Sequence, residues 1–293
     1  MAGTWRRRIL IGVLALVGAL LLLAAGLVGL TRRTLAKHYA VTPETITIPD
    51  DSATRESGHH LATAIAKCTG CHGDDVGGDQ MEMGPMGSFP AANLTTGRGG
   101  AQRADADWVR AIRHGVAADG RPLVFMPSGV YAALSAEDLG AIIAWARSMP
   151  PVDRELRPLS IGPIGRILIA LNPTRLVAAA GIDHGAPIPA AVPPGPTAKY
   201  GRYLTAVGGC TYCHGDNLAG GIKEGPPGTP PSADLRPTGP MSAWHEEDFA
   251  TLLRAGQRPD GSAVDPFMPW RFTRFMTDEE ISAVWAYLRG LKS

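Results

Sequence analysis

Apolar residues are spread unevenly along this chain, and the most uniform apolar run lies near the amino terminus. This segment consists of 22 uncharged residues, 9–30, with the sequence ILIGVLALVGALLLLAAGLVGL. At a helical rise of about 1.5 Å per residue this run would extend about 33 Å, enough to cross the hydrocarbon core of a bilayer. The pattern therefore predicts a transmembrane helix.

Two interpretations of this segment compete: a cleaved signal peptide and a retained anchor. The run exceeds the roughly 7–15 apolar residues usual in a signal peptide. The nearest small-residue cleavage pattern, at residues 34–36, follows two arginines. Both observations favour the anchor. The cluster at residues 6–8 is matched by Arg32, Arg33 and Lys37, so the distribution of positive charge alone does not orient the helix.

Amphipathic periodicity predicts a helix near the end of each half of the chain. Residues 135–149 and 277–291 each begin with a hydroxyl residue suited to a helix N-cap, followed by acidic residues in the first turn. Each then carries one apolar stripe at helical spacing. The stripes consist of Leu139, Ile142, Ile143 and Ala146, and of Ile281, Val284, Trp285 and Leu288.

These helices belong to an internal repeat. Residues 58–78 parallel 201–221, residues 106–120 parallel 247–261, and residues 135–149 parallel 277–291. Each unit reads as a short helix, a Gly/Pro-rich loop, a middle helix, a second loop and a final helix. No stretch alternates strictly between apolar and polar residues, so no strand is predicted. The expected fold class is all-α, with two tandem domains.

The segment between the repeats is apolar but interrupted. Residues 160–182 include two prolines and two arginines, which makes a membrane span a poor interpretation. An amphipathic helix remains, either buried between the domains, which we favour, or lying in the membrane surface. Residues 185–197 are proline-rich and predict an extended spacer.

Composition adds two limits. The 293 residues are 19% charged with a net charge of +1, so nothing electrostatic indicates a nucleic-acid partner. Glycine (36) and proline (25) are abundant while aromatic residues make up only 6%. Loop-rich domains with so few aromatic side chains suit a fold whose core is completed by a cofactor.

All four cysteines lie in two Cys-x-x-Cys-His motifs, one in each repeat. Two disulfides or a shared zinc site are the alternatives, but a disulfide does not need the histidine, and the pairs stand 142 residues apart. A c-type haem uses all three residues, two thiols for covalent attachment and an imidazole for the iron. We therefore expect two covalently attached haem c groups. The residues are Cys68, Cys71 and His72, and Cys210, Cys213 and His214.

A second axial ligand is indicated by the repeat. The stretches FMPSG and FMPWR place Met126 and Met268 just before the final helix of each unit, each 54 residues after its histidine. A thioether is a polarisable neutral ligand, and His/Met ligation raises the haem potential. Met149 and Met276 are weaker candidates.

The surroundings of these ligands are less distinct. A ligating imidazole donates its other N–H to a carbonyl or carboxylate, and the Gly-Pro pairs at residues 84–85 and 225–226 are candidates for that carbonyl. Five of the remaining histidines have no repeat partners, and we expect them at the solvated surface. They are His59, His60, His114, His184 and His245.

With both motifs and both methionine loops, the chain resembles a dihaem class I cytochrome c. More closely, it resembles the cytochrome c subunits of membrane-bound quinoprotein alcohol, aldehyde and gluconate dehydrogenases. The resemblance covers residues 58–152 and 200–291, and residues 115–152 are its most specific part. It implies His72, Met126, His214 and Met268 as axial ligands. Those subunits usually carry three haem motifs and a C-terminal anchor, whereas this chain has two motifs and an N-terminal apolar run.

The resulting hypothesis is an electron carrier, not an enzyme, tethered to the inner membrane by its N-terminal helix. Covalent haem attachment takes place outside the cytoplasm, so the haem domains are expected on the periplasmic side. The carrier would pass electrons from a dehydrogenase or quinol-oxidising complex to a downstream cytochrome or oxidase. A haem enzyme such as a dihaem peroxidase, or a structural haem subunit of a respiratory complex, is the alternative. The expected segments are a cytoplasmic tail (1–8), the anchor (9–30), a linker (31–56), the first cytochrome c domain (57–152), a second linker (153–198) and the second domain (199–293).

Overall fold

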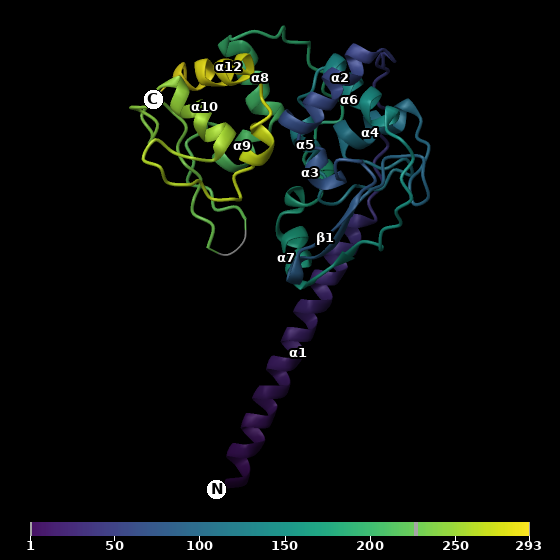
Figure 1. The fold of residues 1–293 in the computed structure, drawn as a ribbon. Coiled ribbons are helices and arrows are strands. Elements are labelled where there is room, and N and C mark those ends of the chain that lie inside the picture. The colour runs from purple at the N-terminus through teal and green to yellow at the C-terminus, as the bar shows by residue number, and fades with distance from the viewer. Residues whose placement is uncertain (1, 226–227, 293) are drawn as a thin grey trace.

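The computed structural model describes residues 2–225 and 228–292. It shows two helical bodies side by side and one long helix, α1, that projects away from them (Figure 1). We call the two bodies the first and second repeat units. The first holds α2 to α6 and the second holds α8 to α12.

Helix α1, Ala2–Leu35, contains the whole predicted span. It continues past Leu30 to Leu35, and the hydroxyls of Thr31 and Thr34 donate to the carbonyls of Leu27 and Leu30, one turn earlier. Its apolar side chains are exposed along most of its length; Leu22, for example, is 76% exposed. In the described part of the chain it is the one helix long and apolar enough to cross a membrane.

The first repeat unit is built on the predicted helices. Ser135 caps the last one by accepting from the amide of Asp138, as expected from its sequence position. Helix α2 continues into a π-helical turn, η1, before the first cysteine motif. The helices are α2 (Ser52–His60), η1 (Leu61–Ile65), α3 (Thr69–His72), η2 (Gly84–Met86), α4 (Asp105–His114), α5 (Ser128–Tyr131) and α6 (Ala136–Ser148).

The second repeat unit has the same order of main helices. Thr277 forms a capping box with Glu280 at the start of the last helix. The helices are α8 (Ala198–Val207), α9 (Cys210–His214), α10 (Glu246–Ala255), α11 (Trp270–Thr273) and α12 (Asp278–Arg289). In each unit the first helix packs on the last, α2 on α6 and α8 on α12.

The structure is mostly helical, and a small antiparallel sheet contradicts the prediction that the chain has no strands. Its strands are β1 (Asp79–Glu82), β2 (Gly87–Ala91) and β3 (Ser160–Ile161), in the order β1-β2-β3. They are too short for an alternating pattern to stand out, and β3 comes from the linker. Gly87 lets the backbones approach, because a Cβ there would lie 2.1 Å from the carbonyl oxygen of Ser160. The described part of the second unit has no matching sheet.

The linker differs from the single predicted helix over residues 160–182. Helix α7 covers only Pro163–Leu171 and stops before Pro173, because the residue preceding a proline disfavours the helical conformation. Two 3₁₀ turns follow, η3 (Pro173–Arg175) and η4 (Ala178–Ala180). Helix α7 packs on α1, η2 and β2, so the expectation that it is buried between the two units was wrong.

The two units meet in an interface with reciprocal contacts. In the repeat alignment His60 corresponds to Tyr203, and Asp138 corresponds to Glu280. The His60 Nε2 lies 2.8 Å from a carboxylate oxygen of Glu280, and the Tyr203 hydroxyl donates to Asp138. Each unit thus uses its first helix to contact the capped start of the other unit's last helix. A single apolar core, which includes Ile65 and Val207, extends through both units.

Candidate haem sites

Each cysteine motif forms a short helix of its own. Cys68 is the N-cap residue of α3, and Cys210 is the first residue of α9. Just before the first cysteine the backbone passes through the left-handed region, at Lys67 (φ 57°) and at Gly209 (φ 69°). The preceding helix therefore ends just before the motif in both units. One helical turn then places the two cysteines and the histidine on one face.

The cysteines are half-buried, and none of the four forms a disulfide. Burial raises the pKa of the Cys68 thiol to about 12 and also raises the pKa of the other three thiols. Among the described residues, no three His, Cys, Asp or Glu side chains converge as metal ligands. The geometry therefore supports neither the two disulfides nor the shared zinc site.

Both motif histidines are held by a backbone carbonyl. The Nδ1–H of His72 donates to the carbonyl of Ala92, and that of His214 donates to the carbonyl of Ala233, both at 2.8 Å. This leaves Nε2 of each ring as the free ligand atom. Burial lowers the pKa of both histidines, which favours the neutral imidazole that can bind a metal. The expectation that Gly84-Pro85 and Gly225 supply these carbonyls was wrong; Pro226 lies outside the described residues.

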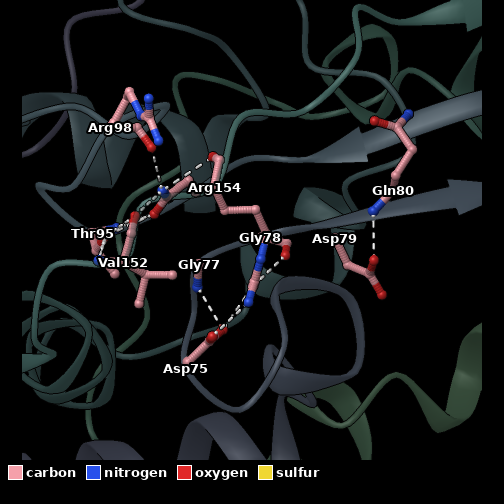
Figure 2. Close-up of polar contacts among 10 residues, drawn as sticks. Asp75, Gly77, Gly78, Asp79, Gln80, Thr95, Arg98, Val152 and Arg154 are labelled. Atoms are coloured by element: carbon pink, nitrogen blue, oxygen red, sulfur yellow. Dashed lines mark hydrogen bonds and ion pairs between the residues drawn. The ribbon is translucent and has the colours of Figure 1, made fainter.

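A buried network fixes the loop that carries the Ala92 carbonyl. Asn93, 1% exposed, donates to the carbonyl of Val152 at 2.7 Å and accepts from the amide of Thr95 at 2.9 Å. Close by, Arg154 forms a two-pronged ion pair with Asp75, three residues past His72 (Figure 2). The start of the linker is thereby bound to both loops around the first histidine.

The sequence does contain a signal for these carbonyls. Ala92-Asn93-Leu94 and Ala233-Asp234-Leu235 are a repeated triplet 20 and 19 residues after the two histidines. The amide of Leu94 donates to Val76 at 2.8 Å, and that of Leu235 donates to Leu218 at 2.9 Å. The triplet escapes notice because the histidine is bound by a main-chain atom, which no residue type identifies.

Met126 and Met268 occupy matching turns. The prolines that follow have nearly the same backbone angles, φ −82° and ψ 48° at Pro127, and φ −80° and ψ 45° at Pro269. In each turn the methionine carbonyl accepts from the amide two residues later, at 2.9 Å and 2.8 Å. Both methionines are half-buried and pack against the apolar core. Their ligation of iron remains a prediction.

In the first unit the methionine turn is tied to the cysteine motif. Tyr131, at the end of α5, donates from its hydroxyl to the carbonyl of Ala66 at 2.7 Å, two residues before Cys68. The Cys68 side chain packs against the same core as Met126. The other candidates lie elsewhere in the repeat: Met149 follows α6 and Met276 precedes α12. They share no equivalent position.

The two motifs also lie close to each other. Lys67 donates from Nζ to the carbonyl of Gly208 at 2.6 Å, which joins the residue before Cys68 to the segment before Cys210. Burial lowers the pKa of Lys67, and charges on Cys210 and Cys68 would oppose that shift. A lysine thus stands between the two motifs, inside the interface of the two units.

The residues around each motif fit a covalently bound haem. They provide two unpaired thiols, a neutral imidazole whose Nδ1 is already bonded, and a thioether on a rigid turn. Thr69, between the first two cysteines, has a buried hydroxyl with no hydrogen-bond partner in the described part of the chain. An orphaned polar atom at this place is consistent with a group that completes the site.

Three of the other histidines, His60, His114 and His184, depart from the surface prediction. His114 is 1% exposed, and its Nε2 lies 3.0 Å from a Glu44 carboxylate oxygen. Its Nδ1 faces Nδ1 of His184 at 3.2 Å. His60 joins the two units through Glu280, and His59 stacks on Trp145. His59 and His245 are exposed, as predicted, and His245 is the N-cap residue of α10.

Comparison with known families identifies both units. Residues 198–292 match the profile of the family described as cytochrome c, and residues 53–145 match that described as cytochrome C oxidase, cbb3-type, subunit III. The chain therefore carries cytochrome c domains in both halves, and such domains imply covalently bound haem c.

Among whole proteins, the chain is homologous to cytochrome c subunits of dehydrogenases, which confirms the resemblance drawn from the motifs. It is 28% identical over 282 residues to the alcohol dehydrogenase (quinone) cytochrome c subunit of Gluconacetobacter polyoxogenes, covering 83% of this chain and 57% of that protein. It is 33% identical over 101 residues to the fructose dehydrogenase cytochrome subunit of Gluconobacter japonicus, covering 32% of this chain and 21% of that protein. The chain thus spans little more than half the length of the first of these relatives.

Proposed function

We propose that the protein is a membrane-tethered dihaem cytochrome c that carries electrons from a dehydrogenase or quinol-oxidising complex to a downstream cytochrome or oxidase. The observation that carries this proposal is the duplication of one complete site: a cysteine helix, a carbonyl-bound histidine and a methionine turn. The duplicated residues are two thiols, an imidazole and a thioether, groups that attach and ligate a haem, which supports a role in binding and tuning the cofactor.

Each site has four residues with distinct tasks. Cys68 and Cys71 attach the first haem, and His72 and Met126 are its axial ligands; the second set is Cys210, Cys213, His214 and Met268. The haem supplies reversible one-electron chemistry, and His/Met ligation raises its potential. The proposed domains are residues 57–152 and 199–293, joined by the linker 153–198.

The arrangement suits transfer between the two sites. Lys67 connects the segments before Cys68 and Cys210, and one apolar core extends through both units. The relatives are described as subunits of alcohol, fructose and gluconate dehydrogenases, which supports a dehydrogenase as electron donor. Helix α1 would hold the protein on the inner membrane, with both domains on the periplasmic side.

Paired cysteine variants test the two sites. The intact exported protein should have the mass of the chain plus two haems and show a c-type α band when reduced. Replacing Cys68 and Cys71 by alanine should remove one haem and leave the other, and the matched change at Cys210 and Cys213 should do the reverse. A protein that carries no haem, or a wild-type chain with one, would contradict the proposal.

Ferric spectra separate this function from its alternatives. A carrier with both axial positions filled should be low-spin and resist cyanide, whereas a dihaem peroxidase needs one open position. High-spin oxidised protein that binds cyanide or peroxide readily would favour the peroxidase. Co-purification in a fixed ratio with other subunits, without electron transfer to a soluble cytochrome, would favour a structural haem subunit.

A further inference from the structure

Helix α7 is apolar on both of its faces. Its inner face, which includes Ile169 at 1% exposure, packs with Leu176 and Val177 in a small core of its own. Its outer face carries Ile164, Ile167 and Leu171 at 46%, 39% and 77% exposure. These three positions are one helical turn apart and form a continuous stripe. An exposed apolar stripe of this kind marks a surface that is normally covered by another molecule or a membrane.

The position of α7 indicates what covers this stripe. The buried hydroxyl of Thr31 lies within hydrogen-bond distance of the carbonyl of Arg166 in α7, at 3.3 Å. Thr31 is the first residue after the uncharged run 9–30. Helix α7 is therefore level with the end of the proposed membrane span. Figure 1 shows it at the end of the two bodies from which α1 emerges.

Basic side chains lie near this end of the proposed membrane span. Arg32 and Arg33 are exposed in the last turn of α1, and Lys37 follows directly after that helix. Arg166 lies on α7 itself. None of these four pairs with an acidic side chain in the described part of the chain. An exposed apolar stripe beside cations that have no acidic partner is typical of a helix that binds an anionic membrane surface.

We propose that α7 lies in the surface of the same membrane that α1 crosses, with Ile164, Ile167 and Leu171 among the lipid chains and the arginines at the headgroups. Its nine residues extend about 14 Å, too short to span a bilayer but sufficient for an interfacial helix. This inference rests on the proposed tether. It adds a second membrane contact, which fixes the orientation of the first haem domain relative to the bilayer.

Photo-crosslinking to lipid tests the proposal on the full haem-loaded protein. The protein is reconstituted in vesicles of phosphatidylethanolamine and phosphatidylglycerol that contain a phospholipid with a diazirine in its acyl chain. After illumination, lipid adducts are mapped by mass spectrometry. We expect adducts in residues 9–30 and in residues 163–171, and none around Phe275, which is equally apolar and 55% exposed on the second unit.

The pattern of adducts separates the inference from the tether. Adducts in residues 9–30 with none in 163–171 would overturn the membrane contact of α7 and leave the tether intact. An absence of adducts in residues 9–30 would overturn the tether, and the inference with it.

A matched pair of variants tests the stripe itself. The double change Ile167→Asp and Leu171→Asp alters only exposed positions and spares Ile169, so both haems should be retained. It should reduce the α7 adducts at least about tenfold, while Phe275→Asp should leave them unchanged. Undiminished α7 adducts in the double variant would contradict the proposal.

Discussion

Met126 and Met268 are the residues on which the assigned chemistry depends most. If Met126 binds iron, Met126→Ala should keep the covalent haem, because Cys68, Cys71 and His72 are unchanged. The oxidised protein should become partly high-spin and bind cyanide, and the potential of the first haem should fall on the order of 0.1 V, within the roughly 0.8 V range that axial ligands control. The weak sulfur-to-iron absorption at the red end of the ferric spectrum is the measurement.

Met149→Ala is the matched control for this change. Met149 also packs against the core of the first unit, but it does not lie in a repeated turn. It should lose stability, up to about 2–5 kcal/mol for a buried methionine, without a spectral change. If the two variants exchanged these outcomes, the ligand would be Met149.

At the residue scale, prediction from sequence is most specific where the chemistry requires a particular side chain. Two thiols and an imidazole at fixed spacing are visible in any alignment of the two halves. The carbonyls of Ala92 and Ala233 were missed because a main-chain acceptor can come from any residue. His114 was misplaced for a related reason: its burial depends on Glu44 and His184, each 70 residues away along the chain.

At the scale of elements, the closest helix contacts depend on a repeated glycine. A Cβ on Gly201 in α8 would lie 1.8 Å from the carbonyl oxygen of Ala283 in α12, and one on Gly58 in α2 would lie 1.9 Å from that of Ala141 in α6. Gly201→Ala should therefore force the two helices apart. Overpacking of this kind typically costs about 1–3 kcal/mol, and more where backbone atoms clash.

Gly129→Ala provides the control, since a Cβ at that position would meet nothing within 4 Å. It should be neutral or stabilise the protein by up to about 1 kcal/mol through helix propensity. Chemical denaturation of the haem-loaded variants measures the difference. Equal stabilities for Gly201→Ala and Gly129→Ala would show that α8 and α12 can separate without cost.

The predictability of an element followed its local signals. Helices with an N-cap and an apolar stripe, α6 and α12, appear within one or two residues of their predicted bounds. The sheet could not be foreseen, because two strands are four and five residues long and the third comes from the linker. Helix α7 was expected to be longer, and Pro173 explains why it is not.

At the scale of the whole molecule, the contact between the two domains should depend on pH. The hydrogen bond that His60 donates to the Glu280 carboxylate raises the pKa of His60 above its usual value. The contribution of this pair to stability is therefore complete below the unfolded pKa of about 6.5 and is lost as the pH rises through the higher folded value. Thermal unfolding of wild type and His60→Gln should differ most near pH 6 and converge in alkaline solution.

Tyr203→Phe removes the reciprocal contact and serves as the control. Burial and the neighbouring Asp138 carboxylate raise the pKa of Tyr203 well above its usual value, so its hydroxyl stays protonated throughout this range. The difference between wild type and Tyr203→Phe should therefore be independent of pH from about 6 to 9. A constant difference for His60→Gln as well would contradict the assigned ion pair.

The packing of the two domains was the part of the molecule least accessible from sequence. Motif spacing indicates that there are two units, but not which surfaces meet. His60 and Glu280 are 220 residues apart, and neither residue type is unusual on a helix surface. The alignment of the two repeats shows that His60 corresponds to Tyr203 and that Glu280 corresponds to Asp138, but the contact between them is visible only in the structure.

That correspondence has an evolutionary consequence. In a two-fold symmetric homodimer, each contact occurs twice: position i of one copy contacts position j of the other, and position j of the first contacts position i of the second. We infer that the two halves descend from a single-haem protein that paired with itself before its gene was duplicated and fused. His60–Glu280 and Tyr203–Asp138 are then divergent descendants of one ancestral contact. Because α1 and α7 pack on one half only, the fusion made formerly interchangeable copies structurally distinct.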